Sequence, residues 1–341
     1  MFKNKISFCT VSMNRLNHIK ETILDNIKDN ISYKNLEFVL LDYNSDDNLK
    51  SWIKSNLSSF IDQGVLKYYR TEEPKSFHRS HSRNVALKLA KGDIVCNLDA
   101  DNYLGKEFAH YINYQFSFKD KIFLTSGKHD GSFGKVCIKK KDFINVQGYD
   151  EKFSGWGYED EDLYKRLCDY GLERERFFNS EFTNYIEHAN EYRVCNDVEV
   201  SKVEDIYVSY INAKTSLIYY LMVDNNIKYG TVSSLYDGRE LDLIGGWDKG
   251  TVIFEKKHMV FKLKDKKELI FFNTKSNKMV SKEGIILNLI LDKNLKNKIL
   301  LLLTGFENKN QRWTKNDTSR VNNFDWGSAN LELNFNTQVS I

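Results

Sequence analysis

The chain has 341 residues, of which 41% are hydrophobic and 13% aromatic, and its formal net charge at pH 7 is +3. This length predicts two domains, or one large domain with an appendix. The charge is too small for the strongly basic surface of a nucleic-acid-binding protein, so we expect no nucleic-acid partner.

The first seventy residues alternate between apolar runs and helical patterns. Residues 5–13, 36–42 and 65–69 read as buried strands, with apolar residues at helical spacing between them. This alternation predicts a parallel α/β sheet, in which ligands bind beyond the carboxyl ends of the strands. Polar side chains fall at those ends, and they are Asn14, Arg15, Asp42 and Asp46.

A cluster of cations precedes the next helical pattern, which we place at residues 82–90. Its first turn presents His78, Arg79, His81 and Arg83. Cations at the amino end of a helix oppose the helix dipole, so local stability does not explain them. A diphosphate group would explain them, and a solvated turn is the alternative.

Two aspartates follow the buried strand that we predict at residues 94–98. Asp99 and Asp101 are spaced i, i+2, and in extended chain such side chains point the same way. Both carboxylates can then face one cation, and oxygen ligands that bridge phosphates suit Mg²⁺ or Mn²⁺.

The stretch from residue 148 to 163 combines a Gly-Trp-Gly turn with four consecutive acids, residues 159–162. Acids suit the first turn of a helix, here predicted over residues 160–170, and this explains part of the cluster. Trp156 offers a flat apolar face on which a sugar ring can stack, and Gly157 lets the backbone pass close to a ligand. A carboxylate beside a stacked sugar can take a proton from a hydroxyl.

Taken together, these motifs resemble a glycosyltransferase with the GT-A fold, the Rossmann-like fold of nucleotide-diphospho-sugar transferases, and are similar to the family 2-like enzymes. The matching pieces are T-V-S-M-N-R, V-L-L-D-Y-N-S-D-D, S-R-N-x-A-L-x-x-A-x-G-D and L-D-A-D-N. Residues 133–163 more specifically resemble the carboxyl half of the β-1,4-galactosyltransferases and of the bacterial chondroitin-type polymerases. The resemblance covers roughly residues 5–190.

The resemblance implies roles by position. Asp160 would be the catalytic base and Glu159 a contact to the donor sugar. Asp99, Asp101 and His188 would hold the metal, with Mn²⁺ favoured over Mg²⁺ if the histidine takes part. Contacts to the nucleotide sugar would come from Asn14, Arg15, Asp42, Asp46, Arg83, Asp99, Trp156 and Gly157. One departure is Tyr158, where the family often has a second glycine before the acids.

The expected activity is a metal-dependent inverting transfer of a hexose or N-acetylhexosamine from a UDP-sugar to an acceptor on an oligosaccharide, glycolipid or glycoprotein. A retaining enzyme of similar fold and an inactive carbohydrate-binding protein are the alternatives. A nucleotidyltransferase would need a glycine-rich loop after the first strand, and T-V-S-M-N-R contains no glycine.

The remaining chain changes in texture. We predict a transferase domain over residues 1–196, a helical connection over 197–229, and a β-rich accessory domain over 230–341, arranged as an antiparallel sandwich. Trp313 and Trp326 are expected to lie in a core, with a glycan-binding surface as the alternative. The five scattered cysteines favour free thiols, and no apolar run reaches the roughly 18–20 residues that span a bilayer. We therefore expect a cytoplasmic protein, with peripheral association at the inner face of the membrane as a variant.

Overall fold

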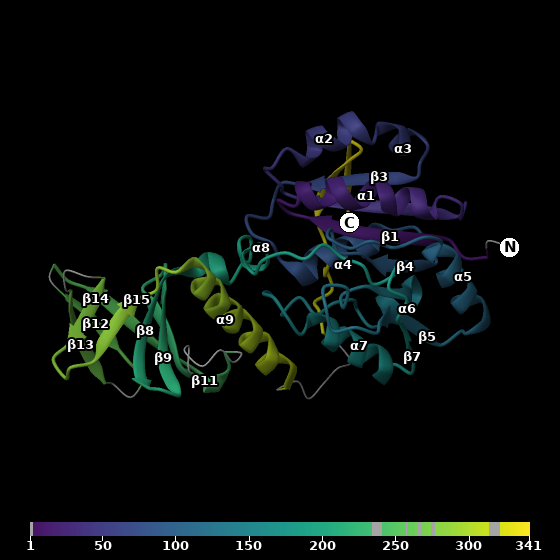
Figure 1. Cartoon of the computed structure of the whole chain (residues 1–341). Helices are drawn as coiled ribbons and strands as arrows, with labels where there is room; N and C mark the ends of the chain where they lie inside the picture. The colour runs from purple at the N-terminus through teal and green to yellow at the C-terminus, as the bar shows by residue number, and fades with distance from the viewer. Residues whose placement is uncertain (1–2, 234–240, 257, 265–266, 274–276, 314–320) are drawn as a thin grey trace. The chain divides into compact units, whose positions relative to one another are not determined.

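The computed structural model describes residues 3–233, 241–256, 258–264, 267–273, 277–313 and 321–341. The chain forms two compact units (Figure 1). The first unit is Met1–His188 together with Asn310–Ile341, and the second is Ala189–Lys309.

The first unit is built on a nine-stranded sheet in the order β17-β16-β3-β2-β1-β4-β6-β5-β7. Strands β3, β2, β1 and β4 are parallel to one another, and β6 runs antiparallel to both of its neighbours. The strands are β1 (Ile6–Ser12), β2 (Leu36–Tyr43), β3 (Leu66–Thr71), β4 (Ile94–Asn97), β5 (Ile122–Ser126), β6 (Val136–Lys139), β7 (Glu173–Phe177), β16 (Asn330–Leu333) and β17 (Thr337–Ser340).

Helices cover both faces of this sheet. One face carries α1, α2, α3 and α5, and the other carries α4, α6 and α7. The helices are α1 (Leu16–Asn30), α2 (Leu49–Asn56), α3 (Ser58–Asp62), α4 (Arg79–Leu89), α5 (Phe108–Phe118), α6 (Lys140–Asn145) and α7 (Glu159–Asp169).

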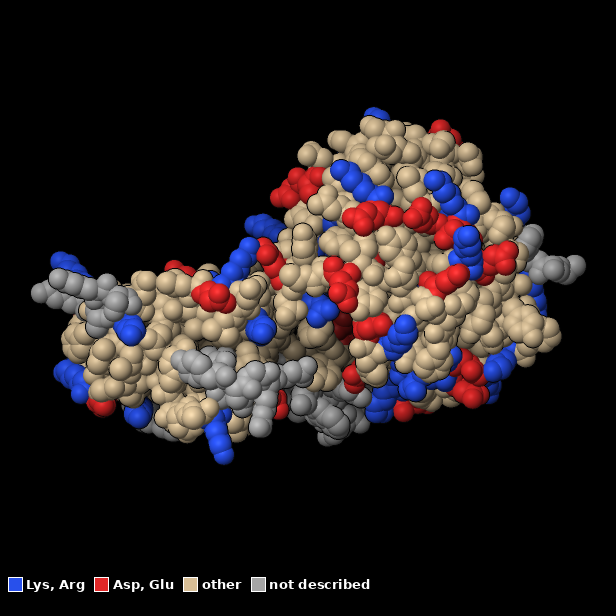
Figure 2. All heavy atoms as spheres, in the orientation of Figure 1, with Lys and Arg blue, Asp and Glu red and all other residues tan. Residues whose placement is uncertain are grey.

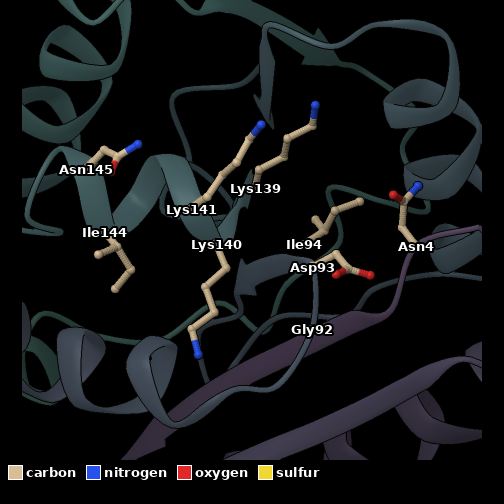
Figure 3. A pocket seen from close by; sticks show the side chains of 9 residues that line it. All are labelled: Asn4, Gly92, Asp93, Ile94, Lys139, Lys140, Lys141, Ile144 and Asn145. Atoms are coloured by element: carbon tan, nitrogen blue, oxygen red, sulfur yellow. The ribbon is translucent and has the colours of Figure 1, made fainter.

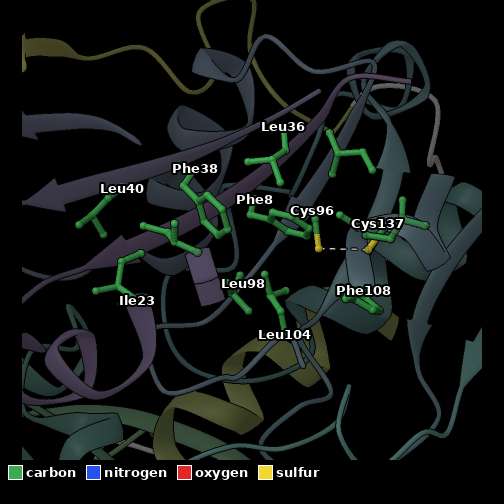
Figure 4. Close-up of a cluster of buried hydrophobic side chains, with 14 of the residues drawn as sticks. Phe8, Ile23, Leu36, Phe38, Leu40, Cys96, Leu98, Leu104, Phe108 and Cys137 are labelled. Atoms are coloured by element: carbon green, nitrogen blue, oxygen red, sulfur yellow. Dashed lines mark hydrogen bonds between the residues drawn. The ribbon is translucent and has the colours of Figure 1, made fainter. Parts of the chain in front are cut away.

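Alternate residues of the central strands feed two separate cores. On β1, Phe8 packs under the α1 and α5 side whereas Cys9 packs under the α4 side. Both faces are therefore apolar, which explains why these strands read as continuous apolar runs in the sequence. Figure 4 shows the first of these cores, in which the free thiols of Cys96 and Cys137 lie 3.1 Å apart on adjacent strands.

The second unit contains a closed barrel of eight antiparallel strands in the order β10-β11-β12-β13-β14-β15-β8-β9. Its interior is filled by side chains such as Tyr219, Phe261 and Phe271. On the outer surface, α9 packs through Ile299 and Leu303 against β8 and β9. The elements are α8 (Glu191–Val194), the 3₁₀ helix η1 (Val200–Lys202), β8 (Val203–Asn212), β9 (Thr215–Met222), β10 (Asn226–Ser233), β11 (Leu243–Phe254), β12 (His258–Lys262), β13 (Glu268–Asn273), β14 (Lys278–Ser281), β15 (Ile286–Leu289) and α9 (Lys293–Trp313).

Several predictions for the region after residue 196 are wrong. The stretch 197–229, predicted as a helical connection, forms strands β8, β9 and most of β10. These strands bury residues toward the barrel interior on one side and toward α9 on the other, so no two-residue alternation is visible in the sequence. Conversely, the apolar run 298–303, read as a strand, lies within α9.

The predicted domain of residues 230–341 also needs correction. It is rich in strands as expected, but they close into a barrel that starts at β8 instead of stacking as a sandwich. Residues 310–341 belong to the first unit, where β16 pairs with β3. Trp326 is buried in the core of that unit, as predicted, and the side chain of Trp313 lies outside the described part of the chain.

Charge is spread evenly where the surface can be seen. Figure 2 shows Lys and Arg interspersed with Asp and Glu over the face that it draws, in keeping with the net charge of +3. Within the described residues, no helix combines the length and the apolar character that a membrane crossing requires.

Candidate active site

The loops that follow β1 and β2 meet at the carboxyl end of the sheet, as the parallel order requires. Asn14 Oδ1 accepts a hydrogen bond from the backbone nitrogen of Asp46 (2.9 Å). The backbone nitrogen of Asn14 donates to Ser45 Oγ (3.1 Å). Arg15 precedes α1, whose first residue Leu16 donates its N–H to Asp47 Oδ2 (2.7 Å). The structure therefore joins the predicted residues Asn14, Arg15 and Asp46 in one loop pair.

Asp42 lies deeper than the sequence indicates. It is fully buried, and it accepts hydrogen bonds from Tyr68 OH (2.6 Å), Arg70 Nη1 (2.6 Å) and the backbone of Ser45 (2.8 Å). These bonds compensate for burial of the charge and fix the loop after β2. Neither Tyr68 nor Arg70 was singled out in the sequence, because their partner lies on a neighbouring strand.

Four predicted residues form one buried charge cluster around Arg83. Its Nη1 donates to Asp160 Oδ1 (3.0 Å) and Glu159 Oε1 (3.2 Å), and its Nη2 donates to Asp99 Oδ1 (2.8 Å). Arg79 adds a longer contact to Glu159 (3.7 Å). Arg79 and Arg83, two of the cations expected to meet a diphosphate, thus meet carboxylates of α7 and of the loop after β4, whereas His81 contacts Tyr43 OH and Ser328 O. A contact of Arg83 with a nucleotide stays a prediction.

Asp160 combines burial with a neutral-range pKa. Burial raises its pKa to about 7, with Glu159 and Asp99 adding to the rise and Arg83 opposing it. Gly134 lies next to the same carboxylates, and a Cβ at this position would stand 2.8 Å from Asp99 Oδ2 and 3.3 Å from Asp160 Oδ2. The absence of a side chain at Gly134 therefore leaves room for both carboxylates.

The Gly-Trp-Gly turn leads directly into these acids. Trp156 and Gly157 are half-buried, and Gly157 has a φ of +100°. Tyr158 also adopts a left-handed conformation, with φ +68°, immediately before α7 begins at Glu159. A tyrosine pays a steric cost there that a glycine does not. The turn places Glu159 and Asp160 in the first helical turn, as the sequence predicts.

Asp101 and His188 meet in a second, separate contact. His188 Nε2 lies 2.7 Å from Asp101 Oδ2, and Asn102 Nδ2 also reaches Asp101 (2.7 Å). Burial alone would raise the pKa of Asp101, but these hydrogen bonds outweigh burial and the pKa lies below its usual value. The ring of His18 packs edge-on against that of His188, with centroids 5.6 Å apart.

Helix α1 holds the loop after β4 with a buried polar stripe that the sequence reading missed. Thr22 Oγ1 donates to the carbonyl of Ala100 (2.8 Å). Asn26 donates to the carbonyl of Asn102 (3.0 Å) and accepts from the backbone nitrogen of Leu104 (2.7 Å). Asn30 binds Gly105 O (3.1 Å) and Ala109 N (2.9 Å). The i, i+4 spacing of these polar residues within an apolar helix pattern was the available signal.

The predicted metal ligands are only partly brought together. Asp101 and His188 are in contact, whereas Asp99 turns its Oδ1 to Arg83. Over the described residues, no group of three His, Cys, Asp or Glu side chains is arranged to hold a metal ion. A carboxylate and an imidazole nevertheless suit Mn²⁺, which in nucleotide sites takes further ligands from phosphates and water. The pair Asp101 and His188 therefore fits a divalent ion carried partly by its substrate.

Two protein families match the first unit. Residues 7–121 match glycosyl transferase family 2, and residues 128–190 match the family described as the N-terminal domain of galactosyltransferase. The motifs that carry the resemblance lie within these ranges, so the predicted class and the GT-A fold are confirmed.

Each individual relative matches either a short segment of this chain or a larger part of it at low sequence identity. A segment of 57 residues, 16% of this chain, is 39% identical to human chondroitin sulfate synthase 3, and it spans only 6% of that protein. Among solved structures, a mannosyltransferase of Pyrobaculum calidifontis in complex with GDP-Man and Mn²⁺ aligns with 56% of this chain and 60% of its own, at 17% identity and a TM-score of 0.47. S. aureus TarS in complex with UDP aligns over 55% and 61%, at 16% identity and a TM-score of 0.46.

Proposed function

Because the chain carries a glycosyltransferase domain of the GT-A fold, we propose that it transfers a hexose or N-acetylhexosamine from a UDP-sugar to a hydroxyl group of a glycan acceptor, with inversion at the anomeric carbon. Galactose, N-acetylgalactosamine and N-acetylglucosamine are the candidate sugars, and the family match over residues 128–190 supports galactose. Acceptors on an oligosaccharide, a glycolipid or a glycoprotein fit this proposal, and so does peripheral attachment to a membrane on the cytoplasmic side.

The observation that carries the proposal is the state of Asp160. A general base works best when its pKa is close to the ambient pH, and burial raises the pKa of Asp160 to about 7. Arg83 fixes Oδ1 of this carboxylate, and Oδ2 lies beside Gly134, where the absence of a side chain leaves it room. Asp160 is therefore oriented, with a pKa close to neutral pH.

In the proposed reaction Asp160 takes the proton of the acceptor hydroxyl. The oxygen then attacks the anomeric carbon from the face opposite the leaving group. The bond between that carbon and the diphosphate oxygen breaks, and UDP departs with the electron pair. Glu159, adjacent to the base and held by Arg83, would contact the donor sugar.

The donor would lie along the carboxyl ends of the strands. Asn14, Arg15, Asp46 and Asp99 would contact the nucleotide sugar, and the buried Asp42 would act indirectly, by fixing the loop after β2. Trp156 and Gly157 would border the sugar. Asp101 and His188 would hold Mn²⁺ or Mg²⁺, which when bound neutralises charge on the departing diphosphate.

A panel of UDP-sugars incubated with the protein tests this proposal. Slow release of UDP from one sugar in the presence of Mn²⁺, abolished by EDTA, would support a metal-dependent transferase and identify its donor. Proton NMR of the product would then separate inversion from retention, the main rival. Binding of glycans without turnover of any nucleotide sugar would instead favour a carbohydrate-binding protein.

A further inference from the structure

One lysine of the first unit is completely buried, which is rare for this residue type. Lys135 is 0% exposed and directly precedes β6. Its ammonium group donates hydrogen bonds to the carbonyl oxygens of Tyr103 and Phe182, both at 2.6 Å. Burial lowers the pKa of Lys135 to about 8, so the charged form still predominates at pH 7. An ammonium ion is removed from water here at a cost that the fold must offset.

The two carbonyls belong to the two segments that carry the proposed metal ligands. Tyr103 follows Asp101 in the loop after β4, and Phe182 precedes His188 in the segment after β7. These segments run side by side in opposite directions. Tyr103 N donates to Asn184 O (3.0 Å), Ile186 N donates to Asp101 O (2.8 Å), and Asn102 and Tyr185 form a β-bridge between them.

We propose that Lys135 is a positioning residue, which sets the register of segment 182–188 on loop 99–104 and so brings His188 to Asp101. This proposal rests on the proposed function only where it concerns metal binding. A short two-stranded contact outside the main sheet is weakly specified by itself. The ammonium group of Lys135 adds two charge-assisted hydrogen bonds at one end of this two-stranded contact, and the contact of His188 with Asp101 lies at the other end.

The chain offers a matched control in Lys140. Its ammonium group also donates to two backbone carbonyls, those of Lys88 (2.9 Å) and Ala90, at the end of α4. Figure 3 shows Lys140 with Lys139, Lys141 and Asp93 around a cavity of about 690 Å³. Ile94, the first residue of β4, lines this cavity. The cavity therefore lies at the opposite end of β4 from Asp99.

The test compares the Lys135→Met and Lys140→Met proteins with wild type. The first readout is the imidazole cross-peak of His188 in a carbon–proton NMR spectrum of the metal-free protein at constant pH, assigned by its loss in His188→Gln. The second is the affinity for Mn²⁺ alone, followed by electron paramagnetic resonance of the free ion. Loss of either lysine removes two hydrogen bonds, so both proteins should be less stable than wild type.

We expect only Lys135→Met to move the His188 cross-peak away from its wild-type position, and to weaken Mn²⁺ binding roughly 10–100-fold. If Lys135→Met does not fold, Lys135→Gln, which keeps a donor on a shorter side chain, should give the same changes with smaller amplitude. An unchanged His188 cross-peak, or equal shifts in the two lysine variants, would overturn the proposal. If wild type binds no Mn²⁺ but the cross-peak still moves only in Lys135→Met, the positioning role stands and the metal assignment fails.

Discussion

Replacing Arg83 with methionine tests the electrostatics of the site independently of any substrate. The variant keeps an apolar stem of similar length and removes the cation shared by Asp99, Glu159 and Asp160. The side chain of Arg83 is 6% exposed, and those of Glu159, Asp160 and Asp99 are 4%, 13% and 32% exposed. Water therefore cannot replace the lost charge at Glu159 and Asp160, and these carboxylates are left to repel one another.

The expected loss of unfolding free energy in the Arg83→Met protein is large. Removing one partner of a buried ion pair costs about 3–5 kcal/mol of unfolding free energy. For a domain of the size of the first unit, each kcal/mol lowers the melting temperature by about 2–4 °C, so the Arg83→Met protein should melt roughly 6–20 °C below wild type at pH 7.5.

The loss of stability in the Arg83→Met protein should be smaller at acid pH. Without Arg83, the folded-state pKa of Asp160 rises above its present value of about 7, further from the roughly 3.9 of an unfolded aspartate. A group with a raised folded pKa contributes stability at low pH and loses it as the pH rises through that pKa. The gap between variant and wild type should therefore be smaller at pH 5.5 than at pH 7.5.

Differential scanning calorimetry at the two pH values measures both effects. Arg83→Lys should fall between the two proteins, since one ammonium group cannot reproduce the planar fork that binds three carboxylates. Lys165→Met, which breaks an exposed ion pair with Asp169 on α7, should change the melting temperature little. A drop below about 2 °C for Arg83→Met at pH 7.5, or an equal drop at both pH values, would refute the reasoning.

Three further substitutions follow from the site. Asp160→Asn should reduce UDP release roughly 10²–10⁴-fold while leaving UDP-sugar affinity intact. The wild-type rate of UDP release should decline as the pH falls below about 7, because a base must be ionised to accept a proton. Initial rates of both proteins measured across pH check these two points. Gly134→Ala should impair turnover, since its Cβ would stand 2.8 Å from Asp99 Oδ2, whereas Gly246→Ala, with no atom within 4 Å, should match wild type in the same assay. Tyr158→Gly should raise the unfolding free energy by up to about 1 kcal/mol by relieving the left-handed backbone at φ +68°, and an unchanged or lower melting temperature would contradict that view.

The reactive residues could be singled out from sequence because their signals are local, although their joint contact with Arg83 was not predicted. Asp99 and Asp101 follow a recognisable buried strand, and Glu159 and Asp160 follow a turn rich in glycine. Lys135 gave no comparable signal, and Asn26 gave only its i, i+4 spacing from Thr22 and Asn30. Their partners are backbone carbonyls, which no sequence pattern marks, and Asn26 lies 76 residues from Asn102. Residues that position a site are thus harder to predict from the sequence than its reactive residues.

The errors in the second unit have a different origin. Strands β8 and β9 bury both faces, and α9 contains an apolar run that suits either structure, so periodicity alone could not separate strand from helix. Barrel closure depends on the pairing of β15 with β8, at Asn288 with Val208. This contact joins distant parts of the sequence, so the distinction from a sandwich was not available in advance.

The return of the chain to its first sheet bears on how the protein folds. Strand β16 hydrogen-bonds to β3, and Trp326 packs in the core under α4, although both are made after the entire barrel. In synthesis from the amino end, most of the first unit is made before the barrel, but its strands β16 and β17 are made after the barrel. Until then β3 presents an unpaired strand edge. The barrel can fold during this interval, because all of its strands precede residue 290. The barrel, whose synthesis begins second, should therefore complete its fold before the first unit does.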